Sequence, residues 1–223
     1  MLSESDIEGI LERYIKQESI VSLGTGQTNE DFLKKIALYM ERSGLKIQMV
    51  ATSHHMAMLC SQFKIPLASV EDVEIDVAFD FVDQVDEDFN YVSNETTSLV
   101  RDKMISMDAA EMIVISEEKN FVKTINAPIC VEATTFAIKK TIAHLMNLGE
   151  PKLRVKDNKP ILSETGNYFV DLKFDQIYSL EDLDFEARKI PGVLETSLFL
   201  GYADRAILYG ENLIVKSRLT NTD

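Results

Sequence analysis

The stretch Ile20-Val21-Ser22-Leu23-Gly24-Thr25-Gly26-Gln27-Thr28 decides the fold of this chain. Residues 19–23 have the apolar pattern of a short buried strand, and two glycines follow it directly. A helical pattern begins near Asn29 and stops at Ser43-Gly44, which is a typical helix end. The free N–H groups at a helix start can hold an anion, so the stretch fits an anion-binding loop and a plain tight turn equally well. It is neither a Walker loop nor a complete dinucleotide fingerprint, because Asn29 stands where the latter needs a third glycine.

Strands and helices alternate outward from this stretch up to about residue 125. Ser3 followed by Asp6 is typical of the capping box at a helix start. We expect helices near residues 7–15, 53–63 and 95–109, and strands at 47–51, 75–79 and 112–115. Short apolar strands that alternate with amphipathic helices predict a mainly parallel sheet with helices on its faces.

The pattern becomes looser after residue 125. We expect helices at 134–148 and 179–189, and strands at 154–155, 168–174, 193–199 and 206–209. This part predicts a smaller α+β unit inserted into the α/β fold. We therefore divide the chain into a Rossmann-like domain, residues 1–125 plus 200–223, and an α+β domain, residues 126–199.

Composition excludes several classes of protein. Of the 223 residues, 45% are hydrophobic and 27% charged, which is typical of a globular chain. The net charge of −14 repels a phosphate backbone, so we expect no nucleic-acid partner. No segment reaches the ~18 apolar residues of a membrane span, and the N-terminus lacks the pattern of a signal peptide. We expect a cytoplasmic protein in which Cys60 and Cys130 are small buried residues.

Two segments with carboxylates are candidates for chemistry. The acidic run from Asp80 to Asp88 follows the predicted strand 75–79, at the strand end where α/β proteins bind ligands. A solvated acidic loop explains the same run. Arg101-Asp102-Lys103 on the predicted helix 95–109 indicates, by itself, an exposed charged turn. The pair His54-His55 would point in two directions on a helix, so we predict no metal site there.

Six segments, taken together, resemble ribose-5-phosphate isomerase of the A type over nearly the whole chain. Each motif is weak alone, but six in the same order are specific for the fold and for common ancestry. The matching segments are residues 20–28, Ile65-Pro66-Leu67, Asp80 to Asp86, Leu99 to Lys103, Gly166 to Asp171, and Ile190 to Glu195 with Leu198-Phe199 and Ala203-Asp204.

The resemblance implies a doubly wound, Rossmann-like α/β domain with an inserted ferredoxin-like domain, in a homodimer or homotetramer. It implies the interconversion of ribose 5-phosphate and ribulose 5-phosphate, in the non-oxidative branch of the pentose phosphate pathway. The reaction passes through an enediolate and uses no metal or organic cofactor. The resemblance assigns catalysis to Asp80, Asp83 and Asp102. It assigns binding of the phosphorylated pentose to Gly24, Thr25, Gly26, Gln27, Thr28 and Lys119.

The chain departs from the family pattern in its catalytic segment. Asp102 stands where the family has its catalytic glutamate, and Ser93 where it has a lysine. Asn94, Glu95 and Thr96 replace three glycines, and Glu95 is a candidate substitute base. Shortening the carboxylate side chain by one methylene moves the carboxylate on the order of 1 Å, a displacement that can cost about a hundredfold in rate.

Three interpretations of function stay open at this point. The first is an active aldose–ketose isomerase for a pentose 5-phosphate, with either full or impaired activity. The second is a non-catalytic sugar-phosphate-binding member of the same family. The third is a related enzyme of different chemistry with Glu95 as a nucleophile.

Overall fold

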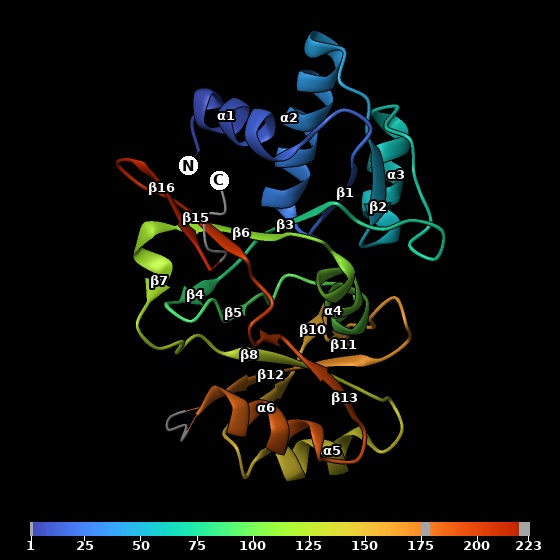
Figure 1. The fold of residues 1–223 in the computed structure, drawn as a ribbon. Coiled ribbons are helices and arrows are strands. Elements are labelled where there is room, and N and C mark those ends of the chain that lie inside the picture. Colours follow the sequence, from blue (N-terminus) through green and yellow to red (C-terminus); the bar gives the residue numbers. More distant parts are fainter. Residues whose placement is uncertain (1, 175–178, 219–223) are drawn as a thin grey trace.

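A six-stranded sheet forms the centre of the fold in the computed structural model, which describes residues 2–174 and 179–218 (Figure 1). The strand order is β16-β15-β6-β3-β1-β2, and all neighbours are parallel except β15 and β16. In that order the strands span Leu213–Ser217, Arg205–Tyr209, Met112–Glu117, Val77–Phe81, Ile20–Leu23 and Gln48–Ala51. The chain leaves β1 towards β2 but leaves β3 towards β6, so the gap between β1 and β3 is the switch point of a doubly wound sheet.

Helices cover both faces of this sheet. They are α1 (Glu4–Tyr14), α2 (Gln27–Ser43), α3 (His54–Gln62) and α4 (Leu99–Asp108). Alternate strand residues enter two separate cores, as the pleat of a strand requires. Leu23 and Phe79 pack in the core with α1, α2 and α3, whereas Ala78 and Val114 pack in the core that contains Ile105 of α4.

The inserted unit is a ferredoxin-like βαββαβ arrangement. Its elements are β8 (Ile129–Ala133), α5 (Ile138–Leu145), β9 (Glu150–Leu153), β12 (Tyr168–Lys173), α6 (Leu180–Arg188) and β13 (Val193–Thr196). The strand order is β13-β8-β12-β9 with antiparallel neighbours, and the short hairpin of β10 (Val155–Lys156) and β11 (Lys159–Pro160) branches from it. Helices α5 and α6 lie on the side of this sheet that faces away from the six-stranded sheet (Figure 1).

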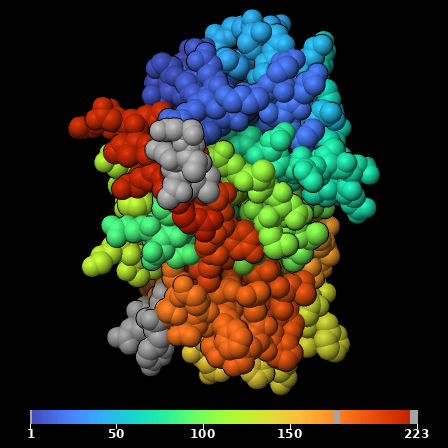
Figure 2. Space-filling model, viewed as in Figure 1, coloured from blue at the N-terminus to red at the C-terminus, as the bar shows by residue number. Residues whose placement is uncertain are grey.

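A third, small sheet lies between the two larger ones (Figure 1). It has the order β14-β5-β4-β7, with bounds Leu198–Phe199, Tyr91–Val92, Gln84–Asp86 and Phe121–Val122, and the 3-10 turn η1 (Glu118–Asn120) precedes β7. The rings of Tyr91 and Phe199 stack across it with centroids 4.5 Å apart. In the space-filling view the N-terminal residues form one end of the molecule and residues of the inserted unit the other (Figure 2).

Local signals set the ends of the elements as expected in several places. Ser3 and Asp6 form the predicted capping box of α1, and α2 ends at Gly44 with a φ of 73°. Both cysteines are buried and free, as predicted. The fold class is confirmed, and the exact domain boundaries at residues 125 and 200 stay a prediction.

Several predicted element boundaries were wrong. The strand predicted at 154–155 is interrupted at Arg154, because β9 ends at Leu153 and β10 begins at Val155. Strand β3 runs to Phe81, so Asp80 lies within the strand and does not follow it. Helix α4 starts at Leu99 because Ser98 is its N-cap, and α5 starts at Ile138 because Ala137 has a left-handed φ of 53°. The predicted strand 193–199 is two strands in different sheets, since the chain changes sheet at Ser197.

No helix among the described residues is long and apolar enough to cross a membrane.

Candidate active site

The loop after β1 packs closely against the end of β3 at the switch point. The backbone N–H of Gly24 donates to the carbonyl of Phe79 at 2.8 Å. A Cβ atom added at Gly24 would lie 1.8 Å from Oδ1 of Asp80, so only glycine permits this approach. The hydroxyl groups of Thr25 and Thr52 are 3.1 Å apart, and Thr52 donates to the carbonyl of Leu23 at 2.9 Å. We call residues 24–28 the glycine loop.

The carboxyl group of Asp80 is held by two side chains from other elements. Asn29 of α2 donates to Oδ1 at 3.0 Å, and the Ser93 hydroxyl donates to Oδ2 at 2.8 Å. Burial raises the pKa of Asp80 to about 7 against the opposing effect of these two hydrogen bonds, and the charge of Asp83 adds to the rise. Asp80 therefore carries a proton for part of the time near neutral pH.

The carboxyl group of Asp102 lies in the first turn of α4. The hydroxyl of Thr96 donates to Oδ2, whereas the buried Oδ1 has no hydrogen-bond partner within residues 2–174 and 179–218. Burial raises the pKa of Asp102 to about 8, and the charges of Asp80 and Glu132 add to the rise, while Thr96 and Arg101 oppose it. An oxygen that is buried and unpartnered costs free energy when it is charged, so the folded protein favours the protonated acid.

Asp80 and Asp102 line one small cavity of about 20 Å³, together with Gly24 and Thr52. This volume is enough for a single water molecule. The charge of Asp80 adds to the raised pKa of Asp102, so the protonation states of the two groups are linked. By itself the cavity is too small for a whole pentose phosphate.

The start of α4, which carries Asp102, is anchored by the inserted unit. Glu132 of β8 has no exposed surface, and its Oε2 accepts the backbone N–H groups of Leu99 at 2.8 Å and Val100 at 3.4 Å. A carboxylate at this position complements the positive end of the helix dipole. Its Oε1 accepts three further bonds, all from the turn that precedes β12: from Ser163, Thr165 and Asn167.

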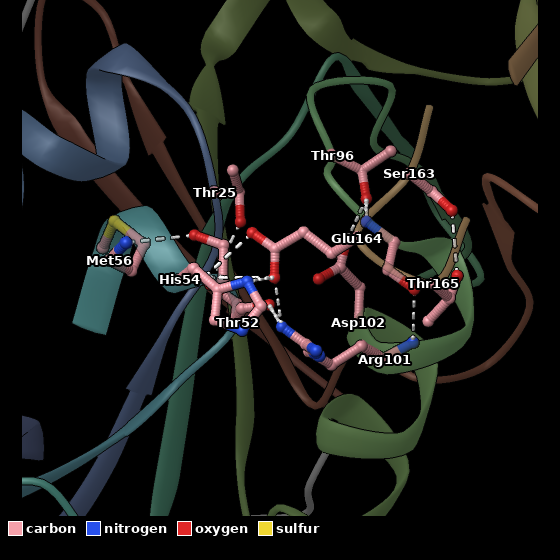
Figure 3. Close-up of polar contacts among 12 residues, drawn as sticks. Thr25, Thr52, His54, Met56, Thr96, Arg101, Asp102, Ser163, Glu164 and Thr165 are labelled. Atoms are coloured by element: carbon pink, nitrogen blue, oxygen red, sulfur yellow. Dashed lines mark hydrogen bonds and ion pairs between the residues drawn. The ribbon is translucent and has the colours of Figure 1, made fainter. Parts of the chain in front are cut away.

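The same turn also contributes a carboxylate of its own, that of Glu164, which binds residues on both sides of the switch point. Figure 3 shows Arg101 and His54 converging on Glu164. Arg101 donates to Glu164 at 2.6 Å and to the carbonyl of Thr52 at 3.3 Å, and the backbone N–H of His54 donates to Glu164 at 2.9 Å. Through Thr52 these contacts continue to Thr25 of the glycine loop.

The other residues that the resemblance assigns to the site lie outside the cavity formed by Asp80 and Asp102. Asp83 is exposed, and its Oδ2 accepts the backbone N–H of Asn94 at 2.9 Å. Glu95 lies over the glycine loop, where its Oε1 accepts the N–H of Gln27 at 3.2 Å. Thr28 is exposed in the first turn of α2. Lys119 is exposed and forms its ion pair with Glu117 at 2.5 Å, at the end of β6.

Two of the plain interpretations from the sequence were wrong. Arg101-Asp102-Lys103 is not an exposed turn, because Lys103 is buried and donates to Glu195 at 2.7 Å while Arg101 binds Glu164. In the acidic run, Glu87 and Asp88 are exposed, but Asp86 is buried and accepts the N–H of Asn90. His54 and His55 bind different carboxylates, those of Glu164 and Glu30, in line with their predicted divergence.

Sequence reasoning missed Glu132 and Glu164. A charged residue within the apolar strand Ile129–Ala133 was a signal for Glu132, because a buried carboxylate needs partners. Glu164 had no such signal, since its partners lie 63 and 110 residues away along the chain.

The fold and site define an α/β protein of the doubly wound class, with paired carboxyl groups beside a glycine loop at the switch point. Residues 48–212 match the family described as ribose 5-phosphate isomerase A (phosphoriboisomerase A). A relative from Sinorhizobium fredii, named ribose-5-phosphate isomerase A, is 34% identical over 206 residues, which cover 88% of this chain and 89% of the relative. The chain belongs to the ribose 5-phosphate isomerase A family.

Solved structures agree with this assignment. A ribose 5-phosphate isomerase A from Methanocaldococcus jannaschii is 25% identical with a TM-score of 0.86, covering 96% of this chain and 98% of that one. A D-ribose-5-phosphate isomerase in complex with phospho-erythronic acid is 30% identical with a TM-score of 0.88, covering 96% and 97%.

We predict that Asp102 makes the fold less stable as the pH rises. Its pKa is near 3.8 in the unfolded chain and about 8 in the fold, so between these values only the folded state holds the proton. The free energy of unfolding then falls with pH, by up to about 1.4 kcal/mol per unit for one proton. Urea unfolding between pH 5 and 8 should show a shallower fall in Asp102→Asn. Asp108→Asn, an exposed change at the other end of α4, is the control. If the free energy of unfolding fell equally with pH in wild type and Asp102→Asn, the raised pKa of Asp102 would be contradicted.

We predict that Glu132→Gln is destabilising by about 3 kcal/mol. The amide group of glutamine presents donors to the N–H and hydroxyl groups that surround Glu132, which leaves buried donors unpaired. Glu150→Gln, an exposed change of the same chemistry in β9, should lie within about 0.5 kcal/mol of wild type. Urea unfolding measures both, and equal effects would exclude the anchoring role.

Proposed function

We propose that the chain is an aldose–ketose isomerase that interconverts ribose 5-phosphate and ribulose 5-phosphate. The observation that carries this proposal is the pair Asp80 and Asp102 around one cavity beside the glycine loop, in a chain of this family. The names of the relatives support the same reaction, and the complex with phospho-erythronic acid supports a phosphorylated sugar as the ligand class.

Asp102 acts as the base in this proposal. Its ionised Oδ1, free of hydrogen bonds in the described part of the chain, takes the proton from C2 of the open-chain aldose. The C–H electron pair forms the C1=C2 double bond, and O1 takes a proton. In the second half, the protonated acid returns its proton to C1, O2 loses its proton, and the C2=O bond forms. One hydrogen has moved from C2 to C1 and one from O2 to O1.

Asp80 supplies the complementary acid. With a pKa near 7, it can donate a proton to the sugar oxygen on which negative charge develops. Ser93 and Asn29 fix the orientation of its carboxyl group. Asp83 is exposed just after the end of β3, and we assign it to sugar binding.

The glycine loop binds the phosphate in this proposal. It offers the N–H groups at the start of α2 and the hydroxyl groups of Thr25 and Thr28, a chemistry suited to an anion. Lys119 would reach the phosphate only after it leaves Glu117, so we assign it a secondary role.

We also propose that the chain forms a homodimer or homotetramer and acts in the cytoplasm. Membership in the family supports both statements. Light scattering on the purified chain tests the first, and a single species of the monomer mass would contradict it.

Asp102→Asn should lower kcat for ribulose 5-phosphate formation by at least about a hundredfold, because the amide cannot take a proton. Asp102→Glu keeps a carboxylate and should retain measurable turnover, and Asp108→Asn should match wild type. An unchanged kcat in Asp102→Asn would exclude Asp102 as the base. Ligand binding without turnover in the wild type would support instead the non-catalytic member of the family.

The pH profile of kcat/KM should be bell-shaped with its maximum between about pH 7 and 8. The reactive form has Asp102 ionised and Asp80 protonated. Because the pKa is about 8 for Asp102 and about 7 for Asp80, this is the less populated of the two one-proton arrangements, but its population still peaks between the two values. A profile with its acid limb near pH 4 and a flat course above it would contradict this assignment.

A further inference from the structure

The carboxylate of Glu95 occupies the anion-binding position of the glycine loop. Its Oε1 accepts the backbone N–H of Gln27, the first residue of α2, at 3.2 Å. The free N–H groups and the helix dipole make this the most favourable place in the loop for negative charge. In the proposed function, the substrate phosphate binds at the same place.

Gly26 provides the space for this carboxylate. Its φ of 114° lies in the region that favours glycine. A Cβ atom added there would lie 2.2 Å from Cδ and 2.4 Å from Oε2 of Glu95. The carboxylate thus fills a cradle against bare backbone, which a side chain at position 26 would close.

Glu95 is held in the cradle only weakly. Its side chain is exposed, and an exposed hydrogen bond to a carboxylate contributes little net free energy, because water replaces it readily. The neighbouring Asn94 is fixed on both sides: its N–H donates to Asp83 at 2.9 Å and its side chain donates to the carbonyl of Pro128 at 2.8 Å. The side chain of Glu95 can therefore leave without moving its segment.

The charges beside the loop do not offset Glu95. Glu30 and Asp31 lie in the first two turns of α2, and Arg154, which donates to the carbonyl of Asn94 at 3.1 Å, is paired with Asp171. Two anions cannot share the N–H of Gln27, so an incoming phosphate both loses this donor and meets like charge.

We propose that Glu95 is an intramolecular competitor for the phosphate of the substrate. A phosphorylated ligand binds only after the carboxylate leaves the Gly26 cradle, so residue 95 sets the KM for phosphorylated sugars. The inference rests on the proposed function for the identity of the substrate, but competition with phosphate can be measured without turnover. Glu95 is then a specificity-determining residue, and it is not the substitute base.

Two substitutions separate charge from bulk. Glu95→Gln keeps the size and an acceptor oxygen but removes the charge, and Glu95→Ala removes all three. Titration calorimetry with inorganic phosphate should give a Kd about threefold lower in Glu95→Gln and about tenfold lower in Glu95→Ala, where tenfold corresponds to about 1.4 kcal/mol. The difference between wild type and Glu95→Gln should shrink in high salt, because exposed charges are screened.

Glu181→Gln, an exposed change in α6 with the same effect on net charge, is the matched control and should leave the Kd as in wild type. With ribose 5-phosphate as substrate, KM should fall in the two Glu95 variants in the same order as the Kd. A phosphate Kd that is unchanged or higher in both Glu95 variants would overturn the proposal. A fall in kcat at constant KM would also overturn it, because it would indicate a base.

The two proposals can fail separately. Tighter phosphate binding in the Glu95 variants, with no turnover by any of the proteins, would support the competitor and contradict the isomerase. Turnover by the wild type and by both Glu95 variants, with the same phosphate Kd in all three, would support the isomerase and contradict the competitor.

Discussion

The fully buried carboxylate of Glu132 is the constraint on which the site depends. A charge without exposed surface is tolerated only when donors surround it, and Glu132 has five of them from two parts of the chain. Two donors are the first N–H groups of α4, and three belong to the turn before β12. The carboxylate therefore fixes where α4 begins relative to the inserted unit. Arg101 and Asp102 follow within one turn, so their positions are set by the same contact.

The switch point then brings negative charge together in a small space. Asp80 approaches Gly24, Asp102 faces the same cavity, and Glu95 covers Gly26. Arg101 forms an ion pair with Glu164, and Lys119 forms one with Glu117. Burial raises the pKa of both Asp80 and Asp102 towards neutrality, and the charges of neighbouring carboxylates add to the rise, which suits an acid and a base that exchange protons near pH 7. The same negative charges repel an anionic substrate. The N–H and hydroxyl groups of the glycine loop have to offset that repulsion.

The sequence was sufficient where the determining contacts are local. The capping box at Ser3, the end of α2 at Gly44 and the alternation around the glycine loop depend on residues a few positions apart. Its ordered motifs also indicated the family and named Asp80 and Asp102. It was insufficient where pairing is distant: the third sheet joins strands of two or three residues from three regions of the chain, residues 84–92, 121–122 and 198–199. The partners of Glu95, Glu132 and Glu164 are distant in the same way, up to 110 residues along the chain.

The central claim is that Asp102 moves a proton between carbon atoms of the sugar. The most direct test follows the C2 hydrogen of ribose 5-phosphate in D₂O by NMR, with wild-type protein and with Asp102→Asn. The account predicts that the C2–H signal decays in the presence of the wild type and persists with the variant. Equal decay with both proteins would exclude Asp102 as the base. A persistent signal with the wild type, under conditions in which the substrate binds, would contradict the isomerase itself.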